Sequence, residues 1–322
     1  MRVVVTGAAG FIGSHVCERL LDRGDQVLGV DAMTDFYPLE LKRRNCAALL
    51  ARSGFDLLTR DLNAPGLAAA LAGADGVCHL AGAPGVRATD ERTFELGNVA
   101  ATRAVMSAAA RAGVPRVVLT SSSSVYAPAA SPVDEDAPVS PLSPYGRSKL
   151  RAERRAADLA ARDGTELVVL RLFTVYGPRQ RPDMAFARFI AAARSGSAMP
   201  VYGDGGQQRD FTYAGDAADA ILLALDRGRP GRVYNVSGAR PVALAEAFAL
   251  LAASLGESPP LEFTAADRRE HRSLAADPTL AARELGYAPR VSLEEGIAAQ
   301  VAAGNGQATV EPAMPPAQAS VQ

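Results

Sequence analysis

The chain has 322 residues, of which 48% are hydrophobic and 21% charged, and 34 basic against 35 acidic residues leave a formal charge of −1. These values are ordinary for a globular enzyme with a large core, and the balanced charge points neither to nucleic acid nor to a membrane surface. Three widely separated cysteines, Cys17, Cys46 and Cys78, contain no CxxC pair, which argues against a disulfide framework and against a metal site.

The N-terminus leads directly from Met1 and Arg2 into an apolar strand pattern. This leaves no room for a signal peptide, and no apolar run reaches the roughly 18 residues that span a membrane. We therefore expect a cytoplasmic protein.

The first 31 residues have the pattern of a dinucleotide-binding unit. Residues 3–5 form a β-branched strand, a glycine-rich turn over residues 7–13 opens a helix, and a second strand over residues 26–30 ends in Asp31. Such glycines let the backbone approach a pyrophosphate, whose charge is met by the helix N-terminus. Asp31 can accept both adenosine ribose hydroxyls and would repel a 2′-phosphate, so NAD is favoured over NADP. A tight turn without a ligand is the alternative.

Strands and helices continue to alternate to about residue 175, which predicts a parallel, doubly wound α/β sheet of the Rossmann type. His79 lies within a strand pattern and is interpreted as a core histidine. The predicted strands cover residues 55–58 (with 61–62), 75–80, 116–120 and 166–173, and the predicted helices cover residues 39–52, 65–72 and 93–112, together with a helix from Tyr145.

A hydroxyl, a phenol and an amine are predicted to meet at the end of one strand. The serines at 121–124 follow the strand over residues 116–120, at the carboxyl end where open α/β sheets place their chemistry. Tyr145 and Lys149 are four residues apart on a helix and share one face. A nearby ammonium lowers the pKa of a phenol, so this group is predicted to transfer a proton beside a hydride acceptor.

Beyond residue 175 the pattern loosens into turns and helices that predict a smaller α/β substrate-binding lobe. The predicted helices are at residues 185–195, 216–227, 242–255, 278–285 and 293–303, and a strand over residues 232–236 returns to the sheet. We expect an NAD-binding domain over residues 1–174 with 211–238 returning to it, a substrate lobe over 175–210 and 239–302, and a disordered tail over 303–322.

The glycine-rich turn in GxxGxxG spacing, the serine run and Tyr145-x-x-x-Lys149 resemble the extended short-chain dehydrogenase/reductases, in the NAD-dependent nucleotide-sugar epimerase/dehydratase family. The resemblance covers roughly residues 1–300 and includes the segments 171–178 and 209–211. Five stretches look most like those of UDP-glucuronate 4-epimerases, namely residues 35–37, 41–43, 83–87, 121–126 and 174–184.

The resemblance implies that Ser122, Tyr145 and Lys149 are catalytic. Tyr145 as phenolate takes the proton from the sugar 4-hydroxyl while C4 gives hydride to NAD. Ser122 hydrogen-bonds the 4-oxygen, and Lys149 lowers the pKa of Tyr145 and holds the nicotinamide ribose. The 4-keto sugar then turns over and is reduced on its other face, so that tightly bound NAD is regenerated.

The resemblance also implies two sets of binding residues. The predicted NAD-binding residues are Gly7, Gly10, Phe11, Ile12, Gly13, Asp31, Asp61, Leu62, Leu80, Ala81, Gly82, Asn98, Tyr145 and Lys149. The predicted UDP-sugar residues are Pro84, Arg87, Ser123, Ser124, Thr174, Arg181, Met184, Phe186, Val201, Tyr202, Arg209 and Arg268. Arg209 matches the residue that clamps the diphosphate, and Arg268 or Arg269 supplies the second arginine.

The two residues after Ser122 distinguish the reactions of the family. Dehydratases carry Asp-Glu there and decarboxylases carry a Glu, whereas this chain has Ser123 and Ser124. Together with the resemblance to UDP-glucuronate 4-epimerases, this difference implies conversion of UDP-glucuronate to UDP-galacturonate as the predicted reaction, with Ser123, Ser124, Thr174 and Arg181 as candidates to hold the substrate carboxylate. The alternatives are epimerisation of UDP-glucose or UDP-N-acetylglucosamine, dehydration, decarboxylation, or a non-enzymatic dinucleotide-binding protein. A homodimer through helices 93–112 and 145–162 is expected from the resemblance.

Overall fold

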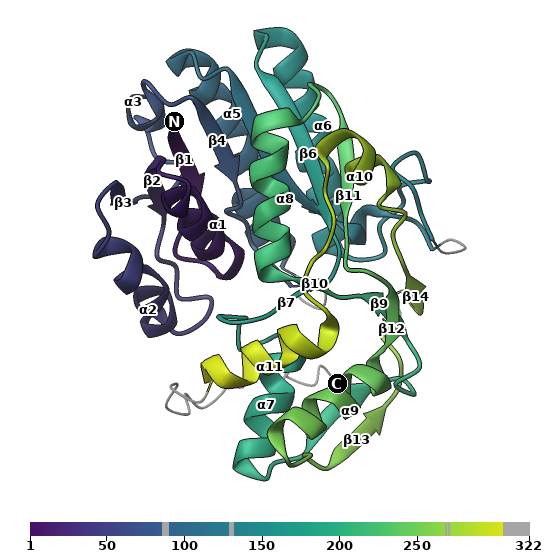
Figure 1. Ribbon diagram of the computed structural model, residues 1–322. Coiled ribbons are helices and arrows are strands. Elements are labelled where there is room, and N and C mark those ends of the chain that lie inside the picture. The colour runs from purple at the N-terminus through teal and green to yellow at the C-terminus, as the bar shows by residue number, and fades with distance from the viewer. Residues whose placement is uncertain (86–89, 129–131, 268, 270, 305–322) are drawn as a thin grey trace, which may run out of the picture.

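A seven-stranded parallel sheet forms the centre of the larger part of the molecule (Figure 1). The computed structural model describes residues 1–85, 90–128, 132–267, 269 and 271–304. The strand order is β11-β6-β5-β4-β1-β2-β3. From β1 the chain adds β2 and β3 toward one edge of the sheet and then β4, β5, β6 and β11 toward the other edge, which confirms the doubly wound topology. The strands are β1 (Arg2–Thr6), β2 (Gln26–Asp31), β3 (Phe55–Thr59), β4 (Gly76–His79), β5 (Arg116–Ser122), β6 (Glu166–Leu172) and β11 (Val233–Val236).

Helices cover both faces of this sheet, as Figure 1 shows. On β1, Val3 and Val5 face one hydrophobic core and Val4 faces the other, because successive strand residues point to opposite sides. One face carries α1 (Phe11–Asp22), α2 (Leu39–Leu50), α8 (Ala214–Arg227) and α10 (Thr279–Leu285), and the other carries α3 (Leu67–Leu71), α5 (Ala101–Ala112) and α6 (Pro144–Asp163).

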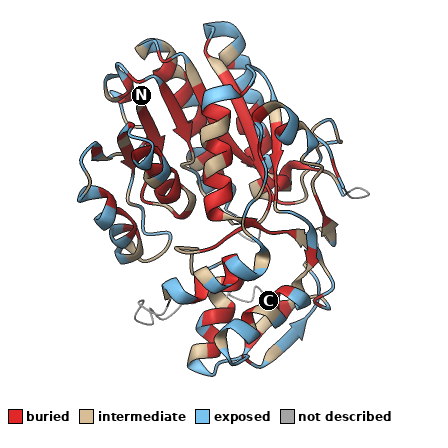
Figure 2. Cartoon of the chain, in the orientation of Figure 1, coloured by how far each residue is buried: buried red, intermediate tan, exposed pale blue. Residues whose placement is uncertain are grey.

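The smaller part of the molecule has a core of its own, visible as buried segments in Figure 2. The rings of Phe189 and Phe248 stack at 4.8 Å between centroids. Its elements are the helices α7 (Ala185–Ser195), α9 (Leu244–Leu255) and α11 (Leu293–Gly304), the strand pair β8 (Met199–Tyr202) with β13 (Leu261–Thr264), and the three-stranded sheet of β12 (Pro241–Ala243), β9 (Gln208–Asp210) and β14 (Ser273–Leu274). The parallel pair β7 (Val175–Tyr176) and β10 (Thr212–Tyr213) lies between the two parts.

Four predictions about elements need correction. The helix expected at residues 93–112 begins at Glu91 as α4 (Glu91–Phe94) and passes through a π-helical turn, η1 (Glu95–Ala100), before α5. Residues 61–62 lie in a turn rather than a strand. The helix expected at 278–285 in the substrate lobe packs instead on the large sheet, since Ala281 and Leu285 of α10 join its core. Helix α11 continues to Gly304, and the rest of the predicted tail lies outside the described residues.

Local sequence signals fix the start of α6, which carries the predicted catalytic pair. Ser143 is the N-cap, and its hydroxyl accepts a hydrogen bond from the Gly146 amide at 3.0 Å. Pro144 occupies the first turn, where its missing N–H costs nothing. Gly164 ends the helix in a left-handed conformation with φ of 76°.

Within the described part of the chain, we find no helix with the length and apolar character needed to cross a membrane. The described residues also include no group of three or more His, Cys, Asp or Glu side chains placed to hold a metal ion.

Asp210 of β9 is a buried carboxyl group, 2% exposed, whose Oδ2 accepts the Ala276 amide at 2.6 Å. Oδ1 has no hydrogen-bond partner among the described residues. Burial raises the pKa of Asp210 to about 6, so the folded state binds more protons than the unfolded state between about pH 4 and pH 6. Asp210 therefore removes stability as the pH rises through this window.

We expect Asp210→Asn to weaken this pH dependence. Between pH 4 and pH 7 the wild type should lose about 2 kcal/mol more of its free energy of unfolding than the variant, following the pKa difference. Urea unfolding of both proteins at the two pH values measures the difference. Parallel pH profiles for the two proteins would show that Asp210 ionises normally.

Candidate active site

The turn between β1 and α1 is shaped so that only glycine fits two of its positions. Gly7 has φ of 74°, and a Cβ there would lie 2.8 Å from the Ala81 nitrogen. A Cβ on Gly13 would lie 2.0 Å from the carbonyl oxygen of Gly7. Gly10 is the N-cap of α1 and offers no side chain to its first amides. The turn thus presents backbone N–H groups and the positive end of the helix dipole, which suit a pyrophosphate.

Asp31 lies at the end of β2 and is 7% exposed. Its carboxylate accepts the Ala9 amide at 3.2 Å and the Met33 amide at 2.8 Å, and Lys42 Nζ lies 3.4 Å from Oδ1. Lys42 is itself buried and also donates to the Thr34 hydroxyl at 3.2 Å. The acid predicted to bind the adenosine ribose is therefore paired with an ammonium that was not among the predicted binding residues.

One cavity of about 1150 Å³ runs from the glycine turn across the carboxyl ends of β4 and β5 to the smaller part of the molecule. It brings together all of the predicted NAD-binding residues and the three predicted catalytic residues. It also reaches nine of the predicted substrate residues, which are Pro84, Ser123, Ser124, Thr174, Arg181, Met184, Val201, Tyr202 and Arg209.

Three predicted substrate residues are not part of this lining. Arg87 and Arg268 lie outside the described residues. Phe186 is only 1% exposed and stacks on Phe211 at 4.9 Å in the core of the smaller part. The apolar face of α7 packs on that core, so the prediction that Phe186 contacts the sugar is not supported by its position.

Ser122, Tyr145 and Lys149 meet where β5 ends against the first turns of α6. Lys149 is 7% exposed, and its Nζ donates to the Thr120 carbonyl at 2.7 Å. The Ser122 hydroxyl is hydrogen-bonded to the phenol of Tyr145, whose ring packs against Phe94 at 5.9 Å between centroids. Two groups that can exchange a proton, the Ser122 hydroxyl and the Tyr145 phenol, therefore lie together in the lining of the cavity.

The electrostatics of Tyr145 differ from the sequence prediction. Burial raises the pKa of the Tyr145 phenol, while the hydrogen bond from Ser122 and the charge of Arg181 act to lower it. Burial lowers the pKa of Lys149 to about 8, against the opposing charge of Glu153. The pKa of the phenol rises because the loss of solvation outweighs the effects of Ser122 and Arg181, and Lys149 is not among the groups that shift this pKa.

Asn98 lines the cavity, but its amide group is fully engaged with the protein. Nδ2 donates to the Ala83 carbonyl at 3.0 Å and to the Ser148 hydroxyl at 2.8 Å, and Oδ1 accepts the Ala83 amide at 2.8 Å. Asn98 thus fastens the loop after β4 to α6, one residue before Lys149.

At the substrate end of the cavity, the Arg181 guanidinium donates two hydrogen bonds of 3.0 Å to the Asp183 carboxylate.

His79 is confirmed as a core residue, hydrogen-bonded to Thr6 and Thr102 away from the cavity lining. Lining residues that the sequence prediction missed include Tyr37, Lys42, Arg188, Gln207 and Phe248, for which no local motif gave a signal beyond the aromatic and basic stretch near Tyr37.

The sequence of the chain agrees with this site. The model of the NAD dependent epimerase/dehydratase family matches residues 3–237, which is more than half of the chain. The chain belongs to this family. Its cofactor is NAD, and the glycine turn, the open N-terminus of α1 and Asp31 fit that dinucleotide.

Relatives in the family divide between two reactions. The chain is 37% identical over 309 residues to an uncharacterized UDP-glucose epimerase, YtcB, of Bacillus subtilis (94% of this chain, 97% of that protein). It is 35% identical over 305 residues to a dTDP-glucose 4,6-dehydratase of Streptomyces griseus (93% of each).

Among solved structures, the chain is similar to UDP-glucuronic acid 4-epimerase from Bacillus cereus in complex with UDP-glucuronic acid and NAD. The TM-score is 0.91 at 35% identity, covering 94% of this chain and 98% of that chain. The chain is therefore an NAD-dependent enzyme that modifies nucleotide sugars, and the identities leave epimerase and dehydratase to be separated by the site itself.

Proposed function

We propose that the chain is a UDP-sugar 4-epimerase that converts UDP-glucuronate to UDP-galacturonate. The observation that carries the proposal is the chemistry beside Ser122, where Ser123 and Ser124 line the cavity in place of carboxylates. The acidic residues in the described lining are Asp31, Asp35, Asp61 and Asp183. Asp31 is held at the adenosine end by Lys42, and Asp183 is paired with Arg181.

The residues of the chain would handle the proton at the sugar 4-oxygen. NAD, when bound, supplies the acceptor and donor of the C4 hydride in this transient oxidation and re-reduction. In its phenolate form, Tyr145 accepts the 4-hydroxyl proton and returns it, and Ser122 holds the same oxygen. Lys149 contributes positive charge one helical turn from Tyr145. Since no carboxylate is placed beside Ser122 among the described lining residues, C5 keeps its proton and C6 its carboxylate.

Hydroxyl and guanidinium groups would receive the carboxylate of the sugar. Ser123, Ser124, Thr174 and Arg181 all line the cavity near the catalytic group. A carboxylate meets hydrogen-bond donors there rather than like charges, and an arginine fork matches its geometry. Arg181 would have to exchange Asp183 for the substrate.

A dehydratase is the second candidate, and it is favoured only by the similarity to dTDP-glucose 4,6-dehydratases. Incubating the purified protein with UDP-glucuronate and following the products by NMR separates the two. Formation of UDP-galacturonate supports the proposal. A parallel incubation with dTDP-glucose tests the dehydratase. Formation of a 4-keto-6-deoxy sugar there, without turnover of UDP-glucuronate, would reject the proposed epimerase and support the dehydratase.

We expect Arg181→Ala to raise KM for UDP-glucuronate by about tenfold or more, the usual scale for a lost charge-assisted hydrogen bond. Steady-state kinetics with UDP-glucuronate measures the effect, and Arg188→Ala serves as a control on a second lining arginine. An unchanged KM in Arg181→Ala would remove Arg181 from the carboxylate site.

Three wider features accompany this proposal. The NAD-binding domain comprises residues 1–174 and 211–238, and the substrate lobe comprises residues 175–210 and 239–302 apart from α10. The enzyme acts in the cytoplasm. It forms a homodimer through α5 and α6. Ala101, Ala108 and Ala109 of α5 pack on the sheet, so the exposed surface of these two helices consists mainly of arginines.

A further inference from the structure

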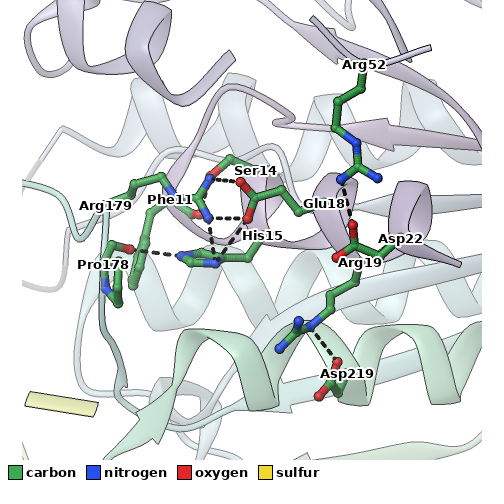
Figure 3. Close-up of polar contacts among 10 residues, drawn as sticks. All are labelled: Phe11, Ser14, His15, Glu18, Arg19, Asp22, Arg52, Pro178, Arg179 and Asp219. Carbon is green, nitrogen blue, oxygen red and sulfur yellow. Dashed lines mark hydrogen bonds and ion pairs between the residues drawn. The ribbon is translucent and has the colours of Figure 1, made fainter. Parts of the chain in front are cut away.

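Helix α1 contacts a loop that lies more than 160 residues away in the sequence. His15 of α1 is 8% exposed and lies between the Pro178 carbonyl, 2.9 Å from Nε2, and the Arg179 guanidinium, 2.8 Å from Nδ1 (Figure 3). Arg179 also places its fork on Glu18, one turn further along α1, at 2.8 Å and 2.5 Å. We call His15, Glu18 and Arg179 the α1 latch.

The partners of His15 fix its proton. A carbonyl oxygen only accepts and a guanidinium only donates, so Nε2 carries the hydrogen and Nδ1 accepts. Burial, followed by the charge of Arg179, lowers the pKa of His15 to about 4, which agrees with the neutral ring. The Glu18 carboxylate is 3.9 Å from Nδ1, too far for a hydrogen bond. The latch is thus a complete set of matched donors and acceptors.

Arg179 adopts a backbone conformation that an arginine rarely takes, with φ of 67°. Left-handed conformations of non-glycine residues persist only where surrounding contacts hold them. The contacts with His15 and Glu18 supply that hold. The latch therefore determines the path of the chain at residue 179, two residues before Arg181.

The opposite side of the same loop is held by α11. Gln300 accepts the Gly177 amide at 2.9 Å and donates to Gln180 at 2.8 Å. Gln180 in turn accepts the Ala187 amide at 3.0 Å at the start of α7. The loop over residues 177–184 is thus held on one side by α1, which begins at the cofactor-binding turn. On the other side it is held by α11 and α7 of the smaller part of the molecule.

Other charged pairs of α1 do not reach this loop. Arg19 pairs with Asp219 of α8 at 2.9 Å, and Arg52 pairs with Asp22 at 2.7 Å (Figure 3). Arg52 lines the same surface cavity as His15 and Arg179. Arg52 therefore offers a control in which an ion pair of α1 is lost and the loop is untouched.

We propose that the α1 latch couples the cofactor helix to the nucleotide-sugar pocket, with His15 and Arg179 acting as positioning residues for Arg181 and Met184. Both Arg181 and Met184 line the active-site cavity of about 1150 Å³, whereas His15 and Arg179 line the separate surface cavity. The latch acts through the loop and not by contact with either ligand. Loss of the latch frees the loop and weakens substrate binding, while the glycine turn retains NAD.

Hydrogen exchange tests the structural part of this inference without any assumption about the substrate. The amides of Gln180 and Met184 are bonded within the loop, to the Gly177 and Arg181 carbonyls. In Arg179→Ala and His15→Ala, exchange in residues 177–184 should become about tenfold faster than in the wild type, and exchange in α1 should not change. Arg52→Ala should leave both segments as they are. Unchanged exchange in the loop of both latch variants would overturn the inference.

Kinetics tests the functional part, which rests on the proposed function. Arg179→Ala should raise KM for UDP-glucuronate about tenfold with kcat within about threefold of the wild type, the signature of lost binding without lost chemistry. His15→Asn, which keeps an acceptor near the position of Nδ1, should recover most of the loss seen in His15→Ala. A fall in kcat with unchanged KM would contradict the positioning role.

Two further measurements keep these outcomes interpretable. Arg179→Gly removes the fork and also the backbone strain, so it should fold well and still raise KM. If Arg179→Gly has the KM of the wild type, backbone strain rather than loss of the latch explains the raised KM of Arg179→Ala, and the inference fails. Absence of turnover of UDP-glucuronate by the wild type, with fast loop exchange in the variants, would reject the proposed substrate and keep the latch.

Discussion

Tyr145→Phe should lower kcat about 1,000-fold while leaving the NAD content and the fold unchanged. The substitution removes one oxygen, the group that is hydrogen-bonded to Ser122, and keeps the ring that packs on Phe94. Loss of a positioned acid–base group typically lowers rates by about 10² to 10⁴. Steady-state kinetics with UDP-glucuronate and the NAD content of the purified protein measure both effects.

Tyr126→Phe is the matched control for this prediction. Tyr126 is fully buried and donates to Asn235 at 2.6 Å, and it is not among the cavity-lining residues. The same atom is deleted, so stability should fall by about 1 kcal/mol and kcat should not change. A Tyr145→Phe enzyme with more than a tenth of the wild-type kcat would show that another group carries the proton.

Gly13→Ala should abolish the stable binding of NAD. The added Cβ would lie 2.0 Å from the Gly7 carbonyl oxygen and 2.8 Å from its carbon. Both atoms belong to the backbone of the turn, so the turn itself must move away from the position that receives the pyrophosphate. We expect affinity for NAD to fall at least about 100-fold, measured by calorimetry and by the NAD content after purification.

Ser14→Ala provides the comparison at the neighbouring position. Ser14 is buried in the first turn of α1, and its hydroxyl donates to the Phe11 carbonyl at 2.9 Å. Its removal changes the helix by one local hydrogen bond and adds no atom. Normal NAD content in Ser14→Ala with loss in Gly13→Ala attributes the effect to the crowded turn. Retention of NAD by Gly13→Ala would contradict the geometry.

Features written in local sequence were predicted well. The seven strands of the large sheet could be recognised because each is a short apolar run, and Asp31 and the serines at 121–124 could be placed because they follow such runs. The start of α6 was marked by Ser143 and Pro144. These signals depend on neighbours along the chain, which a sequence displays directly.

Features set by distant contacts were not predictable in the same way. The packing of Phe186 on Phe211 could not be predicted, because the orientation of a helix face depends on the residues it packs against, and the contact of Phe186 with the sugar stays a prediction. The pairing of Lys42 with Asp31 depends on α2 folding back over β2. Likewise, nothing near His15 in the sequence indicates Arg179, and the pKa of Tyr145 follows from burial, which the spacing to Lys149 does not report.

The π-helical turn η1 has a consequence for how the chain can vary in length. A π-turn holds one residue more than the α-helical turn it replaces, and here that widened turn presents Asn98 to Ala83 and Ser148. Gly97 lies so close to Ala83 that a Cβ there would be 2.8 Å from the Ala83 methyl group. A one-residue deletion would give a more regular helix and a better helical pattern, yet it would turn Asn98 away from both partners. Homologues of this chain should therefore conserve the register of this segment more strictly than its helical propensity.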